Sequence, residues 1–225
     1  MPTKPTKPTK PTARSPVLPR KAQADATRRR LIAAALEAFA TRSFDTVAVH
    51  EIADAAAVAH GLVFHYFGSK RGLYLEALRD VARQLADVHA VPATDAPAVR
   101  IRALLKRHMG FMRRHRKLAL HLFRGGLGTD PEAWQIIDEA RDRATAWIAV
   151  ELGLAPGHRA LRLMLRALAG AIDEATVHWL AHSRSPGLDS LIDALIEMVA
   201  AALRGAARLD PTLDVGAALR ALGMD

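Results

Sequence analysis

The chain has 225 residues, half of them apolar, which is enough for one large domain or two small ones with a buried core. It contains no cysteine, which excludes disulfides, thiolate catalysis and thiolate metal sites. Only 5% of the residues are aromatic while Ala, Leu and Arg dominate, a composition that predicts an all-α protein rather than a sheet protein.

The formal net charge of +9 is concentrated at the start of the chain. Residues 1–30 hold nine lysines and arginines and a single acidic residue, whereas the rest of the chain is nearly balanced in charge. This field favours a polyanion such as DNA as the partner, with a membrane surface as the rival interpretation. No uncharged stretch approaches the roughly 20 apolar residues of a spanning helix, so we expect a cytoplasmic protein that does not enter a membrane.

Residues 1–23 are expected to form a disordered basic tail. Residues 2–12 read PTKPTKPTKPT, a repeat in which proline removes backbone donors and lysine keeps the chain solvated. Two roles stay open for this tail, a solubility tether and a flexible cationic arm that follows DNA phosphates.

Residues 24–71 are predicted to form a compact helical unit. Apolar spacing indicates a first helix to about residue 41 and two short helices at about 48–56 and 59–67. Gly68 and Ser69 then offer a turn with an N-cap, so a long helix is expected from Lys70 to about His89.

Residues 72–225 are expected to form a second helical domain, joined to the first unit by the long helix. Capping residues and prolines predict where its helices begin, and a clean apolar stripe marks the last long one. About nine principal helices result for the whole chain. Those of the second domain are predicted at 95–116, 118–124, 130–153, 155–182 and from 185 onward, with a short extra helix at 214–222.

Residues 46–70, TVAVHEIADAAAVAHGLVFHYFGSK, have the pattern of a helix-turn-helix. Such a motif needs apolar residues that lock two short helices together and exposed side chains on the second helix that face the major groove. The inner face is supplied by Val49, Ile52, Ala53, Val58, Val63 and Phe67. The outer side is left with His60, Gly61, Leu62, Phe64, His65 and Tyr66. Beside Lys70, this face can donate to phosphates and contact base edges.

The stretch Leu31–Leu78, above all IADAAAV followed by GLVFHYFGSKRGLY, resembles the signature of the TetR family of one-component repressors. The resemblance covers about 50 residues, and the remaining chain fits the family in length and helix count. It implies a sequence-specific DNA-binding transcriptional regulator that is not an enzyme. The expected form is a dimeric repressor that a small-molecule effector releases from a palindromic operator.

The resemblance also implies roles for individual residues of the motif. Lys70 and the ring of Phe64 would anchor phosphates, with Tyr66 beside them. The residues that would approach bases are His50, His60, Gly61, Leu62 and His65.

Several positions depart from the family pattern. Ala57 stands where a turn glycine is usual and must avoid or tolerate a left-handed backbone. Phe64 replaces the usual tyrosine and has no hydroxyl for a phosphate, and Val47 and Ala48 lack the hydroxyl that would cap the second helix. The recognition helix contains no arginine, so strong reading of guanine depends on the histidines.

For the second domain, the resemblance implies that the last two long helices pair with those of a second copy as a four-helix bundle. The stripe that suits this use, with intrachain core as the alternative, consists of Leu188, Leu191, Ile192, Leu195, Ile196, Val199 and Leu203. The helices before it would enclose a pocket for a largely apolar effector. The bulky residues available to line that pocket are Phe111, Met112, Phe123, Trp134, Trp147, Met164 and Trp179.

Other functions are weaker alternatives. Glu174, His178 and His182 lie on one helix face but span about 12 Å, too far for one ion to bind all three, so no metal or cofactor is expected. An effector-independent or architectural DNA-binding protein would also suit the basic start. An all-α enzyme is a remote alternative, because no spacing assembles a nucleophile, a base and an oxyanion site.

Overall fold

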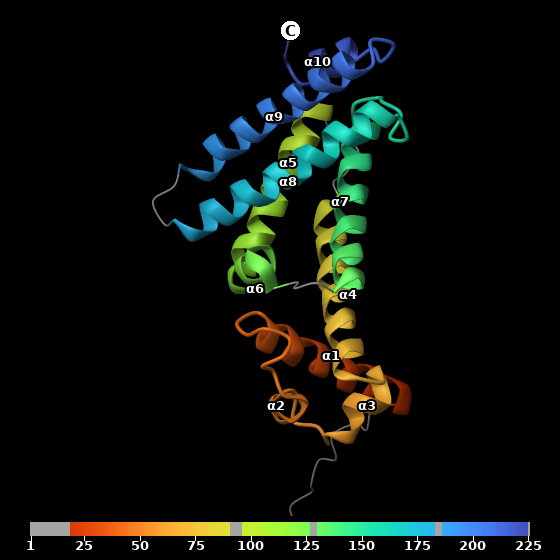
Figure 1. Ribbon diagram of the computed structural model, residues 1–225, viewed down its shortest axis with the longest axis vertical. Coiled ribbons are helices and arrows are strands. Elements are labelled where there is room, and N and C mark those ends of the chain that lie inside the picture. The colour runs from red at the N-terminus through yellow and green to blue at the C-terminus, as the bar shows by residue number, and fades with distance from the viewer. Residues whose placement is uncertain (1–18, 91–95, 127–129, 183–185, 225) are drawn as a thin grey trace, which may run out of the picture.

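The computed structural model describes residues 19–90, 96–126, 130–182 and 186–224 (Figure 1). Within these ranges the chain forms ten α-helices, a short π-helical turn and no strand, which confirms the prediction of an all-α fold. Residues 1–18 of the predicted tail lie outside the described residues. Residues 20–23 belong to the first helix, so the tail was predicted to extend too far.

Three helices and the first half of a fourth form the lower part of the molecule in Figure 1, and the fourth continues upward beside α7 (Pro131–Glu151). They are α1 (Arg20–Phe39), α2 (Val49–Ala55), α3 (Gly61–Phe67) and α4 (Lys70–His89). The bounds of α4 agree with those predicted, because Ser69 caps its first turn through a hydrogen bond that its Oγ accepts from the backbone N–H of Gly72, at 2.9 Å.

The remaining helices form the upper part of the molecule. Pro97 and Pro131 occupy first helical positions, as predicted, whereas Pro156 and Pro186 lie in the turns before α8 and α9. These two helices therefore begin later than predicted. None of the helices described has an apolar stretch long enough to cross a bilayer. The upper elements are α5 (Pro97–Arg114), α6 (Arg116–His121), η1 (Leu122–Gly126), α7 (Pro131–Glu151), α8 (Arg159–Ala181), α9 (Leu188–Leu209) and α10 (Gly216–Ala221).

The buried side chains gather mainly in two clusters. One cluster fills the space between α1, α2, α3 and α4 and includes Leu118, Leu122 and Ile136 from the upper part. The other joins α5, α7, α8, α9 and α10. Side chains of α6, η1 and α7 thus complete the lower core. The domain boundary between residues 71 and 72 stays a prediction, and side-chain packing extends across it.

Ion pairs connect the start of α4 to the start of α7. The Arg71 guanidinium donates two hydrogen bonds to the carboxylate of Asp130, at 2.8 and 2.9 Å, and Arg79 pairs with Glu132. Asp130 also caps α7 by accepting from the backbone N–H groups of Glu132 and Ala133. The lower and upper parts are therefore held together by paired charges as well as by shared core.

The apolar stripe of α9 faces the interior of its own chain, which corrects the predicted dimer interface. Its central residues are between 0 and 5% exposed and pack against α5 and α8, so a second copy cannot contact them. The intrachain alternative holds for these five residues, which are Ile192, Leu195, Ile196, Val199 and Leu203. Leu188 and Leu191 are half-buried against the same core.

Candidate functional site

The turn between α2 and α3 is closed by backbone hydrogen bonds. Ala57 adopts a φ of 51°, in the left-handed region that normally favours glycine. The backbone N–H of Ala57 donates to the carbonyl of Asp54 at 2.9 Å, and that of Val58 donates to Ala53 at 3.0 Å. The alanine thus tolerates the left-handed conformation that the missing glycine would have supplied.

The inner faces of α2 and α3 are packed as predicted. Ile52, Ala53 and Val63 are at most 1% exposed, while Val58 and Phe67 are partly buried against the same cluster. This packing fixes the angle between the two helices. It turns the opposite side of α3, the recognition helix, toward solvent.

Five of the eight residues predicted to contact DNA are exposed, whereas Leu62, Tyr66 and Lys70 are partly buried and Tyr66 packs against the core cluster. Phe64 is 46% exposed, the most exposed large apolar side chain of the lower part, and its ring centroid lies 5.4 Å from that of His60. His65 pairs in the same way with the partly buried Tyr66, at 5.2 Å. The exposed positions on this face are His50, His60, Gly61, Phe64 and His65, and Leu62 is partly buried.

Lys70 lies at the edge of this face, at the first position of α4. Its ammonium group lies 4.6 Å above the ring centroid of Phe44 and donates to the backbone carbonyl of Asp45 at 3.3 Å. An ammonium group has three donors, so it can bind a phosphate while it keeps this contact. The loop between α1 and α2 therefore positions the cation that the sequence singled out.

No side chain at Ala48 caps the first turn of α2, but the carboxylate of Glu51 bonds to the backbone N–H of this N-cap residue. Glu51 accepts from the backbone N–H of Ala48 at 2.9 Å and from two nitrogens of Arg42, at 2.9 and 3.2 Å. The hydrogen bonds from Arg42 and then Ala48 lower the pKa of Glu51 to about 2. A glutamate three residues after the N-cap could have predicted half of this arrangement, but Arg42 comes from a different segment.

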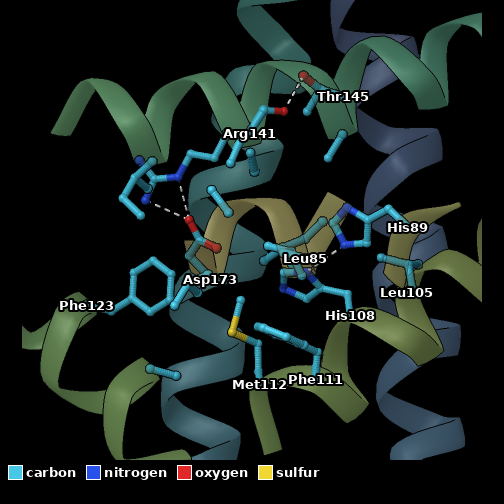
Figure 2. A pocket seen from close by; sticks show the side chains of 18 of the residues that line it. Leu85, His89, Leu105, His108, Phe111, Met112, Phe123, Arg141, Thr145 and Asp173 are labelled. Atoms are coloured by element: carbon cyan, nitrogen blue, oxygen red, sulfur yellow. Dashed lines mark hydrogen bonds and ion pairs between the residues drawn. The ribbon is translucent and has the colours of Figure 1, made fainter. Parts of the chain in front are cut away.

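A second site lies in the upper part, between α4, α5, α6, η1, α7 and α8. It is a largely apolar cavity with a volume of about 100 Å³ (Figure 2). Three of the bulky residues predicted to line a pocket do line it, namely Phe111, Met112 and Phe123.

The other four predicted pocket residues do not line this cavity. Trp147 lines an adjoining pocket that shares Leu85 and His89 with it, and Trp179 lines a pocket between α8 and α9. Trp134 is 40% exposed on α7, and Trp147 lies under the guanidinium of Arg100. Met164 packs over Gly205 between α8 and α9, and the indole N–H of Trp179 donates to the carbonyl of Pro186. Size alone did not distinguish residues of the cavity from those of the helix contacts.

Two pairs of polar side chains in the cavity wall were not predicted. Nε2 of His89 on α4 lies 3.2 Å from Nδ1 of His108 on α5, and Nε of Arg141 donates to Asp173 at 2.7 Å. Burial lowers the pKa of His89 to about 4 and that of His108 to about 3, where proximity to His89 adds a smaller effect, so both rings are neutral at pH 7. Burial raises the pKa of Asp173 against the opposing effect of Arg141. Each pair joins different helices, so no sequence spacing indicated it.

The histidines considered and rejected as metal ligands in the sequence contact each other. The His178 and His182 rings lie 4.2 Å apart, and Nδ1 of His182 donates to the carbonyl of His178 at 2.9 Å. Among the residues that the structure describes, no group of three or more potential ligands is close enough to hold a metal ion.

Two short helices at a closed turn, with a solvent-facing second helix and a lysine beside it, define a helix-turn-helix protein of the DNA-binding class. The family described as "Bacterial regulatory proteins, tetR family" matches residues 31–77, and the "Tetracyclin repressor-like, C-terminal domain" matches residues 97–203. The chain belongs to the TetR family and is a DNA-binding transcriptional regulator.

Individual relatives agree with this assignment. The HTH-type transcriptional activator FasR of Mycolicibacterium smegmatis is 27% identical over 179 residues, which cover 77% of this chain and 81% of FasR. The HTH-type transcriptional regulator BetI of Escherichia coli is 33% identical over 93 residues, 39% of this chain and 47% of BetI. These relatives are regulators rather than enzymes.

Solved structures share the fold. A TetR-family regulator from Streptomyces coelicolor has a TM-score of 0.75 and 28% identity, covering 89% of this chain and 90% of its own. FadR of Bacillus subtilis, solved in complex with stearoyl-CoA, has a TM-score of 0.62 and 19% identity, covering 76% and 96%. The second likeness shows the fold alone.

Proposed function

We propose that the chain acts as a homodimeric repressor that binds a palindromic operator and is released by a small, largely apolar effector in the cavity. The observation that carries this proposal is that α4 belongs to both sites. Lys70 at its start lies beside the recognition helix, and Val81, Leu85 and His89 further along line the cavity. A ligand that displaces α4 therefore acts on the element that carries the DNA-binding unit.

The size of the cavity supports such a displacement. Its volume of about 100 Å³ is below the roughly 300 Å³ at which typical small-molecule sites begin. A ligand larger than the cavity must move the surrounding helices apart. Because Arg71 and Arg79 tie α4 to the start of α7, movement of either helix changes the position of the recognition helix. The effector then favours a spacing of the two recognition helices that does not fit the operator.

For the homodimer, we propose the outward face of α8 and α9 as the interface. Leu163 on α8 is 61% exposed, and it is followed along the exposed side by Ala167 and Gly170. Ala194 and Ala201 are exposed on α9. Small side chains let helices of two copies approach closely, as a four-helix bundle requires.

A charge at this face tests the interface. Leu163→Asp is expected to convert the dimer into a monomer in sedimentation experiments and to abolish preference for a palindrome. Val150→Asp is the matched control, since Val150 is equally apolar and 59% exposed but lies on α7. A Leu163→Asp variant that remains a dimer would place the interface elsewhere.

Selection from random DNA tests the function itself. Purified full-length protein should enrich a palindrome whose half-sites lie about 10–10.5 base pairs apart, or a multiple of that, in line with successive major grooves. Enrichment of no sequence, combined with steep loss of binding at higher salt, would favour the architectural alternative.

The sign of regulation needs its own measurement, because FasR is named an activator. A reporter gene placed behind the selected palindrome should be expressed more strongly when the regulator is removed. Weaker expression on removal would instead identify an activator.

A further inference from the structure

The cavity wall is apolar except for a few side chains, and most of these are already bonded. Arg141 and Asp173 form an ion pair that contributes no net charge, and Arg141 also donates to Asp138. The hydroxyl of Thr145 donates to the carbonyl of Arg141 at 2.9 Å, within its own helix (Figure 2). The polar side chains of the wall are His89, His108, His115, Arg141, Thr145 and Asp173.

His108 differs from the other polar residues of the wall. Its Nδ1 is engaged by His89, whereas its Nε2 is buried and has no hydrogen-bond partner among the described residues. Figure 2 shows the ring of His108 among the side chains of the cavity, close to Leu85 and Met112. A buried imidazole nitrogen without a hydrogen-bond partner costs free energy. A ligand with a polar group that forms a hydrogen bond to this atom would therefore be favoured.

The His89–His108 hydrogen bond restricts what that polar group can be. If His89 donates, Nε2 of His108 carries the hydrogen and needs an acceptor. If His108 donates, its Nε2 is bare and needs a donor. A hydroxyl group satisfies either tautomer because it both donates and accepts.

The charge of the cavity wall further restricts which polar group the ligand can carry. His89 and His108 are neutral, burial and the nearby Arg114 also lower the pKa of His115, and the Arg141–Asp173 pair is internally balanced. A carboxylate or an ammonium group on the ligand would enter this apolar space without an opposite charge to compensate it. The wall therefore favours an uncharged polar group.

We infer that the effector is a small, largely apolar molecule with one uncharged hydroxyl group, which shares a hydrogen bond with Nε2 of His108. The inference rests on the proposed function only in taking the cavity as the effector site. His108 is then the residue that determines specificity, and the apolar wall supplies most of the contact area.

Matched pairs of probes test this assignment. Toluene and p-cresol differ by one hydroxyl, as do hexane and 1-hexanol, while p-toluate and benzylamine add an anion and a cation. Binding to the full chain without DNA is measured by calorimetry or thermal shift. Each hydroxyl probe should bind about tenfold or more tightly than its apolar partner, and more tightly than the charged probes. An entirely apolar cavity would favour toluene and hexane, because hydroxyl groups lose hydrogen bonds to water on burial.

Variants of His108 connect the preference to this side chain. His108→Phe keeps a ring of similar shape and should reduce the preference for p-cresol over toluene to less than about twofold, while His108→Gln should retain part of it. His178→Phe, an exposed position on α8, should leave the preference unchanged. The ¹⁵N resonance of Nε2 in His108 should shift with p-cresol and stay in place with toluene.

Three results would overturn the inference: equal affinity for the members of each pair, an unchanged preference in His108→Phe, or no binding of any probe at millimolar concentration. These results are independent of the DNA selection. A protein that selects a palindrome but fails this panel refutes the effector class alone, whereas one that prefers p-cresol but selects no DNA refutes the regulatory role.

Discussion

The helix-turn-helix and the cavity differ in how the chain assembles them. The residues of the recognition face come from one continuous stretch, 50–70, whose positions follow from the helical repeat and one turn. The residues of the cavity come from five α-helices and η1 and meet only through tertiary packing. The first site is therefore encoded locally, and the second depends on how distant helices pack. The changes below test that contrast, from the largest expected effect to the smallest.

Lys70→Ala should weaken binding to the selected palindrome about 100-fold, because a dimer loses one phosphate contact in each copy and each such loss is worth about tenfold. Fluorescence anisotropy at constant salt measures the affinity. Lys106→Ala is the control, since Lys106 lies on α5 and pairs with Asp189. A loss of less than about threefold would remove Lys70 from the interface.

Gly72→Ala should destabilise the junction between α3 and α4. A Cβ at this position would lie 2.1 Å from the backbone oxygen of Phe67, which cannot move without displacing the end of the recognition helix. The expected loss is about 2–3 kcal/mol in the free energy of unfolding, measured with urea. Gly110→Ala, a helical position with open space around it, should instead gain up to about 1 kcal/mol. Equal effects of the two changes would contradict the close approach.

Acid should destabilise the upper part through its buried histidines. The pKa of His89 is lowered to about 4 and that of His108 to about 3, from an ordinary value of 6.5. Below pH 6.5 the unfolded chain therefore binds more protons than the folded chain. The stabilising contribution of the neutral rings is complete above pH 6.5 and is lost as the pH falls toward 4. Each histidine adds a slope of at most about 1.4 kcal/mol per pH unit.

His108→Gln should flatten this dependence, and His178→Gln, at an exposed position, should leave it unchanged. Urea unfolding at several pH values between 7 and 4 gives the comparison. Identical slopes for the native chain and His108→Gln would show that His108 is not held neutral by burial.

Asp130 separates capping from ion pairing at the link between the two regions. Asp130→Ala removes both the N-cap of α7 and the partner of Arg71, and should cost about 1 kcal/mol or somewhat more. Asp130→Asn keeps the cap and loses only the charge; its cost should stay below about 1 kcal/mol, because the Arg71 side chain is half-exposed. If both variants lose the same free energy of unfolding in urea, the contribution of Asp130 comes from the ion pair and not from the cap.

The sequence predicted the lower part well because its signals are local. The bounds of α4, the turn at Ala57 and the cap at Ser69 each follow from a few neighbouring residues, and the structure has them in place. The inner face of the motif is likewise buried as its spacing indicated.

Predictions that depended on tertiary packing were less accurate. The stripe on α9 is apolar whether it meets its own chain or a second copy, and periodicity does not distinguish these outcomes. Trp134 and Trp147 were chosen for size, but Trp134 is exposed on α7 and Trp147 lines only an adjoining pocket. His89 and His108 lie 19 residues apart on different helices, so only their packing brings them together.

The most direct test of the account is the distance between the two recognition helices in the DNA complex. The chain has no cysteine, so Ala59→Cys, at an exposed position just before α3, takes a single spin label in each copy. On the selected palindrome, the interspin distance should be narrowly distributed near 34–36 Å, or about a multiple of one DNA turn. The absence of any interspin coupling, or a broad distribution unrelated to the DNA turn, would contradict the proposal that a dimer places two copies of α3 in successive major grooves.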